Sequence, residues 1–288
     1  TVRLIDGSGT ANAPVAFQAS ADVSSNGGTT AVSAATVALQ TTVSAVNDAP
    51  VATSGTVTLP PVSEDTTSPP VNTVAGLFTP IFDDTRDTVP AGSSANTLAG
   101  IAIVGNAATA AQGVWRYSTD GGATWTNIPT TGLSDTTAII LPSTARVEFL
   151  PEGNWNGTPG SLTVRLIDGS GTANAPVAFQ GSADVSSNGG ITAVSADTVV
   201  LQTTVSAVND APVVSGTATV PAVNEDGSPA GTAVSSLLGQ ATVSYNDTNA
   251  DTIPGGSTGT PAAGIAIIGN AATAAQGVWQ YSTDGTSW

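Results

Sequence analysis

The chain contains no lysine, histidine, cysteine or methionine, and its five basic residues are all arginine. Without those side chains it cannot form a Ser-His-Asp or Cys-His nucleophile, a lysine Schiff base or a zinc site of the usual Cys/His type. Disulfides cannot support the fold either. These absences exclude most catalytic chemistry, and they predict a protein that is not an enzyme.

Positive charge is scarce throughout the sequence. Five basic residues against 21 acidic ones give a net charge of −16. We therefore expect no nucleic-acid binding, because such a chain has no basic surface to hold phosphates. No apolar run approaches the roughly 20 residues that span a membrane, so we expect no membrane insertion. Only 9% of the residues are charged and 40% are hydrophobic, which differs from the composition of disordered acidic chains.

Short apolar runs separated by 32 glycines and 18 prolines predict an all-β fold with many turns. Several runs alternate with a period of two, as half-buried strands do. The short strands favour an antiparallel Greek-key β-sandwich. Asn106 to Gln112 is the one weak helix signal. The expected strands of the complete unit are 71–78, 100–104, 114–117, 138–141, 146–150, 162–167, 177–180 and 198–208.

The sequence repeats itself with a period of about 162 residues. Residues 1–50 recur as 163–212 with four differences, and residues 100–121 recur as 264–285 with two. A unit of this length fits a whole domain rather than a solenoid coil. We predict three segments: 1–48 is the C-terminal part of one repeat, 49–210 is a complete repeat, and 211–288 is the N-terminal part of the next. The chain is expected to be an excerpt from a longer protein.

Acidic residues survive in the part of the repeat where the two copies differ most. Each copy keeps a Glu-Asp pair near its start, two aspartates some 20 residues later, and an Asn-Asp at the preceding joint. Carboxylate and amide oxygens are the ligands that Ca²⁺ prefers. Capping of turns by the same side chains is the alternative. The candidate ligands are Asp48, Glu64, Asp65, Asp84 and Asp87, and in the next copy Asn209, Asp210, Glu225, Asp226, Asp247, Asn249 and Asp251.

The spacing of Asp247, Asn249 and Asp251 resembles the opening of an EF-hand loop, but the later glycine and glutamate of that loop are missing. The other copy, 84–87, is one residue shorter and contains Arg86. A calcium site in both copies therefore cannot depend on this loop alone. We expect the joint and the Glu-Asp pair to complete it.

Two runs resemble a known family. Val-Asn-Asp-Ala-Pro at the joint and the run 223–232 look like cadherin repeats. The run 150–169, with Pro-Glu-Gly-Asn-Trp-Asn-Gly-Thr and then Asp-Gly, is similar to bacterial cadherin-like and VCBS-type tandem repeats. Such repeats form the middle of giant secreted adhesins. The resemblance implies β-sandwiches in series at the bacterial cell surface, with Ca²⁺ at the joints and neighbouring repeats as partners. Because the unit is longer than a cadherin repeat, it also implies insertions or an added subdomain.

Two other functions stay open. Identical chains could assemble into a filament or surface layer by strand exchange, because incomplete repeats leave sheet edges unpaired. The hairpin with Trp115, Tyr117 and Trp125 could bind a glycan by stacking, although a cross-strand aromatic pair that supports the sheet is the simpler interpretation. Glu148 and Glu152, which could be imagined as a glycosidase pair, are expected to be ordinary surface residues.

Overall fold

The computed structural model describes residues 1–7, 22–88, 94–171, 181–247 and 259–288. Strands make up most of the regular secondary structure in these residues, which confirms the predicted all-β class. The elements in chain order are β1 Val51–Ala52, β2 Thr56–Thr58, β3 Val62–Ser63, β4 Asn72–Thr73, α1 Val74–Phe78, η1 Thr79–Ile81, β5 Phe82–Asp83, η2 Thr85–Asp87, β6 Leu98–Asn106, β7 Gly113–Ser118, β8 Thr126–Asn127, β9 Ala138–Pro142, β10 Arg146–Pro151, β11 Leu162–Asp168, β12 Ser182–Ala183, β13 Val199–Gln202, β14 Val205–Ser206, β15 Val213–Gly216, α2 Val234–Leu238 and β16 Val243–Asn246.

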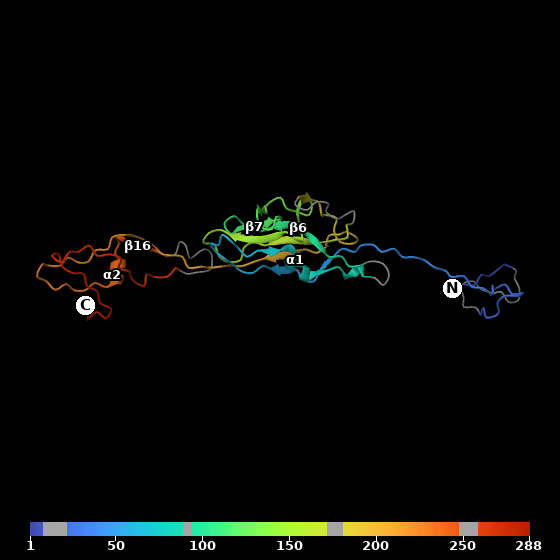
Figure 1. The fold of residues 1–288 in the computed structure, drawn as a ribbon, viewed down its shortest axis with the longest axis horizontal. Helices are drawn as coiled ribbons and strands as arrows, with labels where there is room; N and C mark the ends of the chain where they lie inside the picture. Colours follow the sequence, from blue (N-terminus) through green and yellow to red (C-terminus); the bar gives the residue numbers. More distant parts are fainter. Residues whose placement is uncertain (8–21, 89–93, 172–180, 248–258) are drawn as a thin grey trace. The chain divides into compact units, whose positions relative to one another are not determined.

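The chain divides into two compact units, Thr1–Ala45 and Val46–Trp288. The division lies three residues before the boundary predicted between residues 48 and 49. The second predicted boundary, between residues 210 and 211, does not separate compact units. Residues 46–210, called the central segment below, hold almost all of the sheet structure, and Figure 1 labels β6, β7 and α1 within it.

Two main sheets make up the central segment. The larger has six strands in the order β12-β9-β6-β11-β13-β2, and the smaller has four in the order β4-β10-β7-β8. Neighbouring strands run antiparallel except at β13 and β2, which are parallel. Two short pairs, β1 with β5 and the parallel pair β14 with β3, lie outside the main sheets. The first and last parts of the segment therefore pair with each other through β2–β13 and β3–β14.

The larger of two buried clusters contains residues of both main sheets. β11 is central to it, because it pairs with β6 on one edge and with β13 on the other. Val164 and Leu166 of β11 face the same core as Ile101 and Ile103 of β6, and all four side chains are completely buried. The alternate residues face the other side of the sheet, where Ala102 and Ile167 belong to a second buried cluster, so β6 and β11 are buried on both faces.

The smaller sheet contributes its aromatic residues to the same core. Trp115 on β7 is opposite Phe149 on β10, and their rings meet edge to face with centroids 5.2 Å apart. Both side chains are fully buried. The indole Nε1 of Trp115 donates a 2.8 Å hydrogen bond to the carbonyl oxygen of Gly160, which satisfies the polar atom that its burial would otherwise leave unpaired. A Cβ on Gly160 would lie 2.0 Å from the carbonyl oxygen of Ala107, so this position requires glycine.

Some expected elements differ from the structure. Residues 71–78 were predicted as one strand, but only Asn72–Thr73 is a strand and Val74–Phe78 forms α1. The Thr73 hydroxyl accepts a hydrogen bond from the backbone N–H of Gly76, which caps the helix and ends the strand. The predicted strand 198–208 is divided into β13 and β14. The run 106–112 forms no helix, since Asn106 ends β6 and residues 110–112 form a turn, and the predicted strand 177–180 lies outside the described residues.

The two partial repeats contain little regular structure where they are described. In Thr1–Ala45, isolated bridges join Val2 to Val37 and Ile5 to Val32. Residues 211–288 contain α2 and the antiparallel pair of β15 with β16, and no helix or strand is found among residues 259–288.

The repeat supplies a matched test of the core. Leu166→Ala should lower the free energy of unfolding by about 2–5 kcal/mol, because it removes a fully buried side chain. Leu4→Ala changes the same residue in the first copy, where the side chain is 61% exposed. It should change the free energy of unfolding by no more than about 0.5 kcal/mol. Chemical denaturation of both variants measures the difference, and equal effects would contradict this core.

Candidate functional site

One group of polar side chains lies where the chain enters the central segment. We call it the entry cluster, and it consists of Asn47, Asp48, Asp84, Asp87, Asn96 and Asp168. Pairing of β1 with β5 brings the joint next to the segment that leads into η2. β11 ends at the same place with Asp168. Residues from four parts of the repeat therefore meet here.

Carboxylates of the entry cluster hold backbone and amide groups in place. Asp87 Oδ1 accepts a 2.7 Å hydrogen bond from the backbone N–H of Asp48, and its Oδ2 accepts one of 3.3 Å from Asn96 Nδ2. Asp84 Oδ2 accepts a 2.6 Å bond from the backbone N–H of Asn96. Asn47 Nδ2 donates to Asp168 Oδ2 at 3.3 Å. The joint is thus fastened to the repeat that follows it.

Negative charge in the entry cluster is buried. Asp84 is 4% exposed, and Asp87 and Asp168 are each 2% exposed. Burial raises the pKa of Asp84, and the nearby carboxylates of Asp168 and Asp87 raise it further, while the hydrogen bond from the Asn96 N–H opposes the change. The Oδ1 atom of Asp84 is buried and has no hydrogen-bond partner. A buried oxygen in this state is costly unless something else binds it.

A second polar group lies where the chain leaves the central segment. We call it the exit cluster, and it consists of Glu64, Asp65, Asn154 and Asn156 together with the backbone of Val208. Glu64 is 2% exposed. Its Oε1 accepts a 2.6 Å hydrogen bond from the Val208 N–H, and its Oε2 accepts one of 2.8 Å from Asn156 Nδ2. The parallel pairing of β3 with β14 places Glu64 beside this departing strand.

The exit cluster has an unusual backbone. Asp65 and Asn154, with φ angles of 61° and 60°, are the two non-glycine residues with positive φ in the described part of the chain. They contact each other, since Asp65 Oδ1 accepts a 2.7 Å hydrogen bond from the Asn154 N–H. Asn156 is 1% exposed, and its Oδ1 has no hydrogen-bond partner. Each cluster therefore contains one buried side-chain oxygen that the protein itself does not satisfy.

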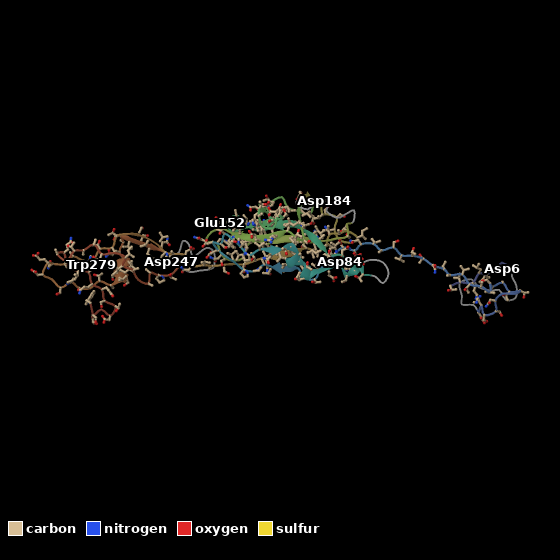
Figure 2. The ribbon with its side chains drawn as sticks, in the orientation of Figure 1. Asp6, Asp84, Glu152, Asp184, Asp247 and Trp279 are labelled. Atoms are coloured by element: carbon tan, nitrogen blue, oxygen red, sulfur yellow. The ribbon has the colours of Figure 1, made fainter. Side chains whose placement is uncertain are left out.

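The structure divides the predicted ligands of the complete repeat between the two clusters. The carboxylates of Asp84 and Asp87 lie near the backbone of Asp48, whose own side chain is exposed. Glu64 and Asp65 do not join them, because they bind the chain segment that leads to the following joint. Figure 2 labels Asp84 and Glu152, the latter next to the exit cluster in sequence, toward opposite ends of the central segment. The expectation that the Glu-Asp pair completes the site of its own joint was therefore wrong.

The candidates in the third copy are only partly comparable. Asp247 is 7% exposed, and its Oδ2 accepts a 2.6 Å hydrogen bond from the Thr260 N–H, as Asp84 does from Asn96. Asn209 donates to the carbonyl oxygen of Asp210. Glu225 and Asp226 are exposed. Asn249 and Asp251 lie outside the described residues.

Neither cluster forms a metal centre of acidic groups alone. Among the described residues, no set of three or more aspartate, glutamate, histidine or cysteine side chains is arranged to hold a metal ion. The hydrogen bonds explain this, because Asp84 and Asp87 direct oxygens to backbone and amide groups of the protein. A metal ion bound at either cluster would need further oxygens from amides, the backbone or a neighbouring repeat.

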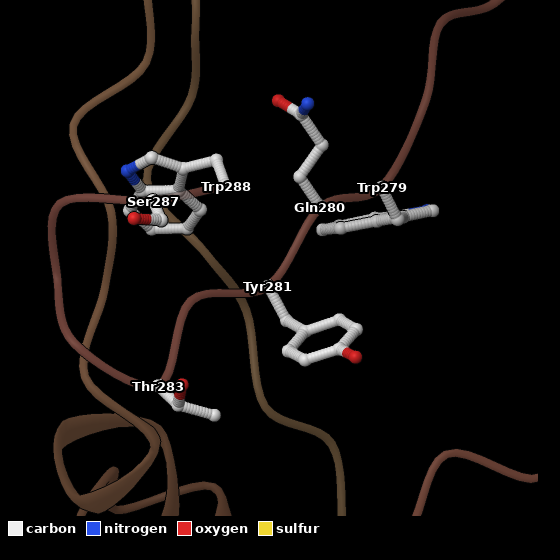
Figure 3. A pocket seen from close by; sticks show the side chains of 6 residues that line it. All are labelled: Trp279, Gln280, Tyr281, Thr283, Ser287 and Trp288. Atoms are coloured by element: carbon white, nitrogen blue, oxygen red, sulfur yellow. The ribbon is translucent and has the colours of Figure 1, made fainter.

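The aromatic hairpin is not an exposed platform in the central segment. Trp115 is fully buried and Tyr117 packs against the core. The Arg116 guanidinium lies over the ring of Trp125, 5.2 Å from its centroid. In the third copy the corresponding Trp279 is 67% exposed. Figure 3 shows the open hollow at that place, lined by Trp279, Gln280, Tyr281, Thr283, Ser287 and Trp288.

Sequence reasoning missed several residues of the two clusters. Asp168 is the last residue of the repeated run 163–168, and Asn156 belongs to the Asn-Trp-Asn-Gly run. Both residues therefore had a signal in the family resemblance. Asn96 had none, since threonine replaces it in the third copy. Glu148 is buried in an ion pair with Arg116 instead of lying on the surface as expected.

Comparisons with known proteins give no further support. No family model, curated protein sequence or solved structure matches the chain. None of the helices in the described part of the chain has the length and apolar character needed to cross a membrane.

The entry cluster can be tested without any metal. Asp87→Ala should lower the free energy of unfolding by about 1–3 kcal/mol, because it leaves the backbone N–H of Asp48 unpaired. Asp197→Ala is the matched control: Asp197 is exposed, and the first copy has Ala35 at that position. Its effect should stay within about 0.5 kcal/mol. If Asp87→Ala instead stabilises the protein in EDTA, repulsion among the carboxylates outweighs their hydrogen bonds.

Proposed function

We propose that the chain is a structural, non-enzymatic part of an extracellular bacterial adhesin or surface fibre, in which repeats of about 162 residues follow one another and Ca²⁺ stiffens each joint. The two main sheets would be the faces of a Greek-key β-sandwich of the cadherin type. The presence of one polar cluster where the chain enters the repeat and another where it leaves is the observation that carries the proposal. The location at the cell surface rests on the resemblance of the run 150–169.

The donor atoms in both clusters suit a hard cation. Asp84 Oδ1 and Asn156 Oδ1 are buried oxygens without hydrogen-bond partners. Ca²⁺ takes six to eight oxygen ligands from carboxylates, amides, backbone carbonyls and water. Bound at a joint, it would supply positive charge and oxygen coordination to such groups. The same oxygens would otherwise destabilise the folded protein, because a buried polar atom without a partner loses its interaction with water.

A joint between two repeats would combine both kinds of cluster. The exit cluster of the preceding repeat contributes the counterparts of Glu64 and Asn156, and the entry cluster of the following repeat contributes those of Asp48, Asp84 and Asp168. Neither set is sufficient alone, which agrees with the lack of a complete acidic site in the described residues. For the second joint of this chain, we assign Glu64, Asp65, Asn209, Asp210 and Asp247 to the same role.

Hydrogen bonds fix the chain on both sides of such a joint, so few residues between the repeats are free to move. Glu64 holds the backbone N–H of Val208, so the preceding repeat controls the chain up to that residue. The next residue, Asn209, corresponds to Asn47, which the following repeat holds through Asp168 and Thr192. In the proposed array, hydrogen bonds of the preceding repeat would therefore fix the chain up to Val208, and those of the following repeat would fix it from the next residue. The acidic groups of both repeats are then confined to a small region, where they repel one another until a cation binds.

Removal of calcium tests the proposal. In 1 mM CaCl₂ the intact chain should unfold at a higher temperature than in EDTA, because a ligand at 100 times its dissociation constant stabilises the folded state by about 2.7 kcal/mol. Mg²⁺ should stabilise less, since it requires a smaller octahedral shell. Scanning calorimetry measures all three conditions.

Two variants locate the effect. Asp84→Asn removes the charge of the carboxyl whose Oδ1 is unpaired, and it should reduce the Ca²⁺-dependent shift. Asp120→Asn removes a carboxylate from the hairpin, where Asp120 bonds Ser118 and Thr124, and should leave that shift unchanged. Equal unfolding temperatures of the unmodified chain in CaCl₂ and EDTA would refute the calcium proposal.

A further inference from the structure

The outer face of the smaller sheet carries two of the five arginines of the chain. Val147 and Phe149 of β10 belong to the buried core. Arg146 and Glu148 alternate with them along the strand, so they lie on the other face. Arg116 of β7 is directly opposite Glu148 in the register and shares that face. Two guanidinium groups therefore lie on one side of one sheet, in a chain whose net charge is −16.

The protein itself neutralises only one of these two arginines. Arg116 forms an ion pair with Glu148, which is buried. Arg146 is half-buried, and it makes no hydrogen bond or ion pair with any described residue. Asp120, in the adjacent turn, directs its oxygens to groups of that turn instead. The five N–H donors of Arg146 are thus open to an acceptor from outside the chain.

An indole ring lies beside the unpaired arginine. The Arg116 guanidinium lies over the ring of Trp125, 5.2 Å from its centroid. Arg146 is close to the same ring, since a Cβ on Gly122 would lie 3.3 Å from Nη1 of Arg146 and 3.8 Å from Cζ2 of Trp125. Gly122 has a φ of 97°, which side-chain-bearing residues rarely adopt, so the turn keeps this space open. Trp125 is half-buried, and its indole N–H makes no hydrogen bond within the described residues.

These groups together suit an acidic sugar. A guanidinium presents two parallel N–H groups to a carboxylate, and this geometry favours planar anions. A half-exposed indole offers an apolar surface against which a sugar ring packs, with a polar N–H at its edge. Glu148, which shares the face, is already paired with Arg116, so the acceptor for Arg146 has to come from the ligand.

We propose that Arg146 and Trp125 form a binding site for the carboxylate-bearing sugars of an acidic polysaccharide. Arg146 binds the carboxylate, and Trp125 packs against the sugar ring that carries it. The ion pair of Arg116 with Glu148 holds the indole in position through the contact of Arg116 with the ring. The site goes beyond the proposed joint, because none of its residues belongs to the entry cluster or the exit cluster and it requires no calcium.

The third copy of the repeat differs at this site. Gln280 replaces Arg116, and the turn that leads to Trp288 is one residue shorter than the turn that leads to Trp125. A glutamine has no charge, so it can form neither the ion pair nor the cation–π contact that holds the indole. The site is therefore a property of individual repeats, and the shared fold does not supply it by itself.

Calorimetric titration with oligomers of glucuronic acid tests the site on the intact chain. EDTA is present, so that calcium cannot bridge the sugar to the acidic clusters. Arg146→Gln should raise the dissociation constant by about tenfold or more, because it removes a charged hydrogen-bond donor. Arg146→Lys keeps the charge without the planar fork, and its dissociation constant should lie between those of the unmodified chain and Arg146→Gln. Arg86→Gln removes the same charge from an exposed arginine in η2 and should leave binding unchanged.

Thermal unfolding shows that the variants keep the fold. Arg146 has no hydrogen bond or ion pair to lose among the described residues, so Arg146→Gln should unfold at nearly the same temperature as the unmodified chain. Trp125→Ala should also weaken binding, because it removes the surface that packs against the sugar. Weaker binding at an unchanged unfolding temperature assigns the loss to the site.

The outcomes are independent of the calcium proposal. Binding that is lost in Arg146→Gln, kept in Arg86→Gln and weakened by NaCl supports the site, since salt screens charges near the surface. Glucose oligomers of the same length should bind far more weakly, because they lack the carboxylate. No binding of glucuronic acid oligomers, equal affinity for glucose oligomers, or unchanged binding in Arg146→Gln would overturn the inference. A polyglutamate peptide that binds as tightly would also overturn it, because the sugar ring would then contribute nothing.

Discussion

The pairing of β6 with β11 is the interaction on which the rest of the fold depends. β11 joins the larger sheet on both edges, and its inward side chains share a completely buried core with β6 and with the aromatic residues of β7 and β10. The described residues of the partial copies contain no pairing of this kind. Identical residues are buried in the central segment and exposed at residues 1–6, so the neighbouring strands determine burial here, and local sequence does not. A two-stranded pair alone is only marginally stable in water, and a larger sheet with an apolar face is needed.

The same strand also connects the core with the entry cluster. β11 ends at Asp168, whose carboxylate accepts a hydrogen bond from Asn47 in the joint. On the other side, β3 and β14 place Glu64 against the chain as it departs. Both joints are therefore anchored to elements that the sheets already position. In the proposed array, a load applied along the repeat would pass through these hydrogen bonds into the sheets.

The sequence was sufficient to predict the all-β class and most long strands, because β6, β7, β9, β10 and β11 contain short apolar runs bounded by turn residues. It was not sufficient for short elements. Residues 74–78 form a helix because Thr73 caps them and because Val74 and Phe78 fill the core, and neither cause is visible in a run of apolar residues. Only some residues of the polar clusters could be predicted from the sequence. Composition and recurrence identified Asp84 and Glu64, but the parallel pairing that sends Glu64 to the following joint is a long-range contact.

The shortage of basic residues, finally, determines how the entry cluster can be neutralised. Arg165 binds Asp135, whose pKa it lowers, and Arg116 binds Glu148. Neither of these two ion pairs includes Asp84 or Asp168. Burial and mutual repulsion already raise the pKa of Asp84, so the folded protein gains if positive charge comes from outside. In the proposed array that charge has to be a proton or a cation, and at neutral pH a divalent cation with many oxygen ligands satisfies more of the buried groups than a proton does.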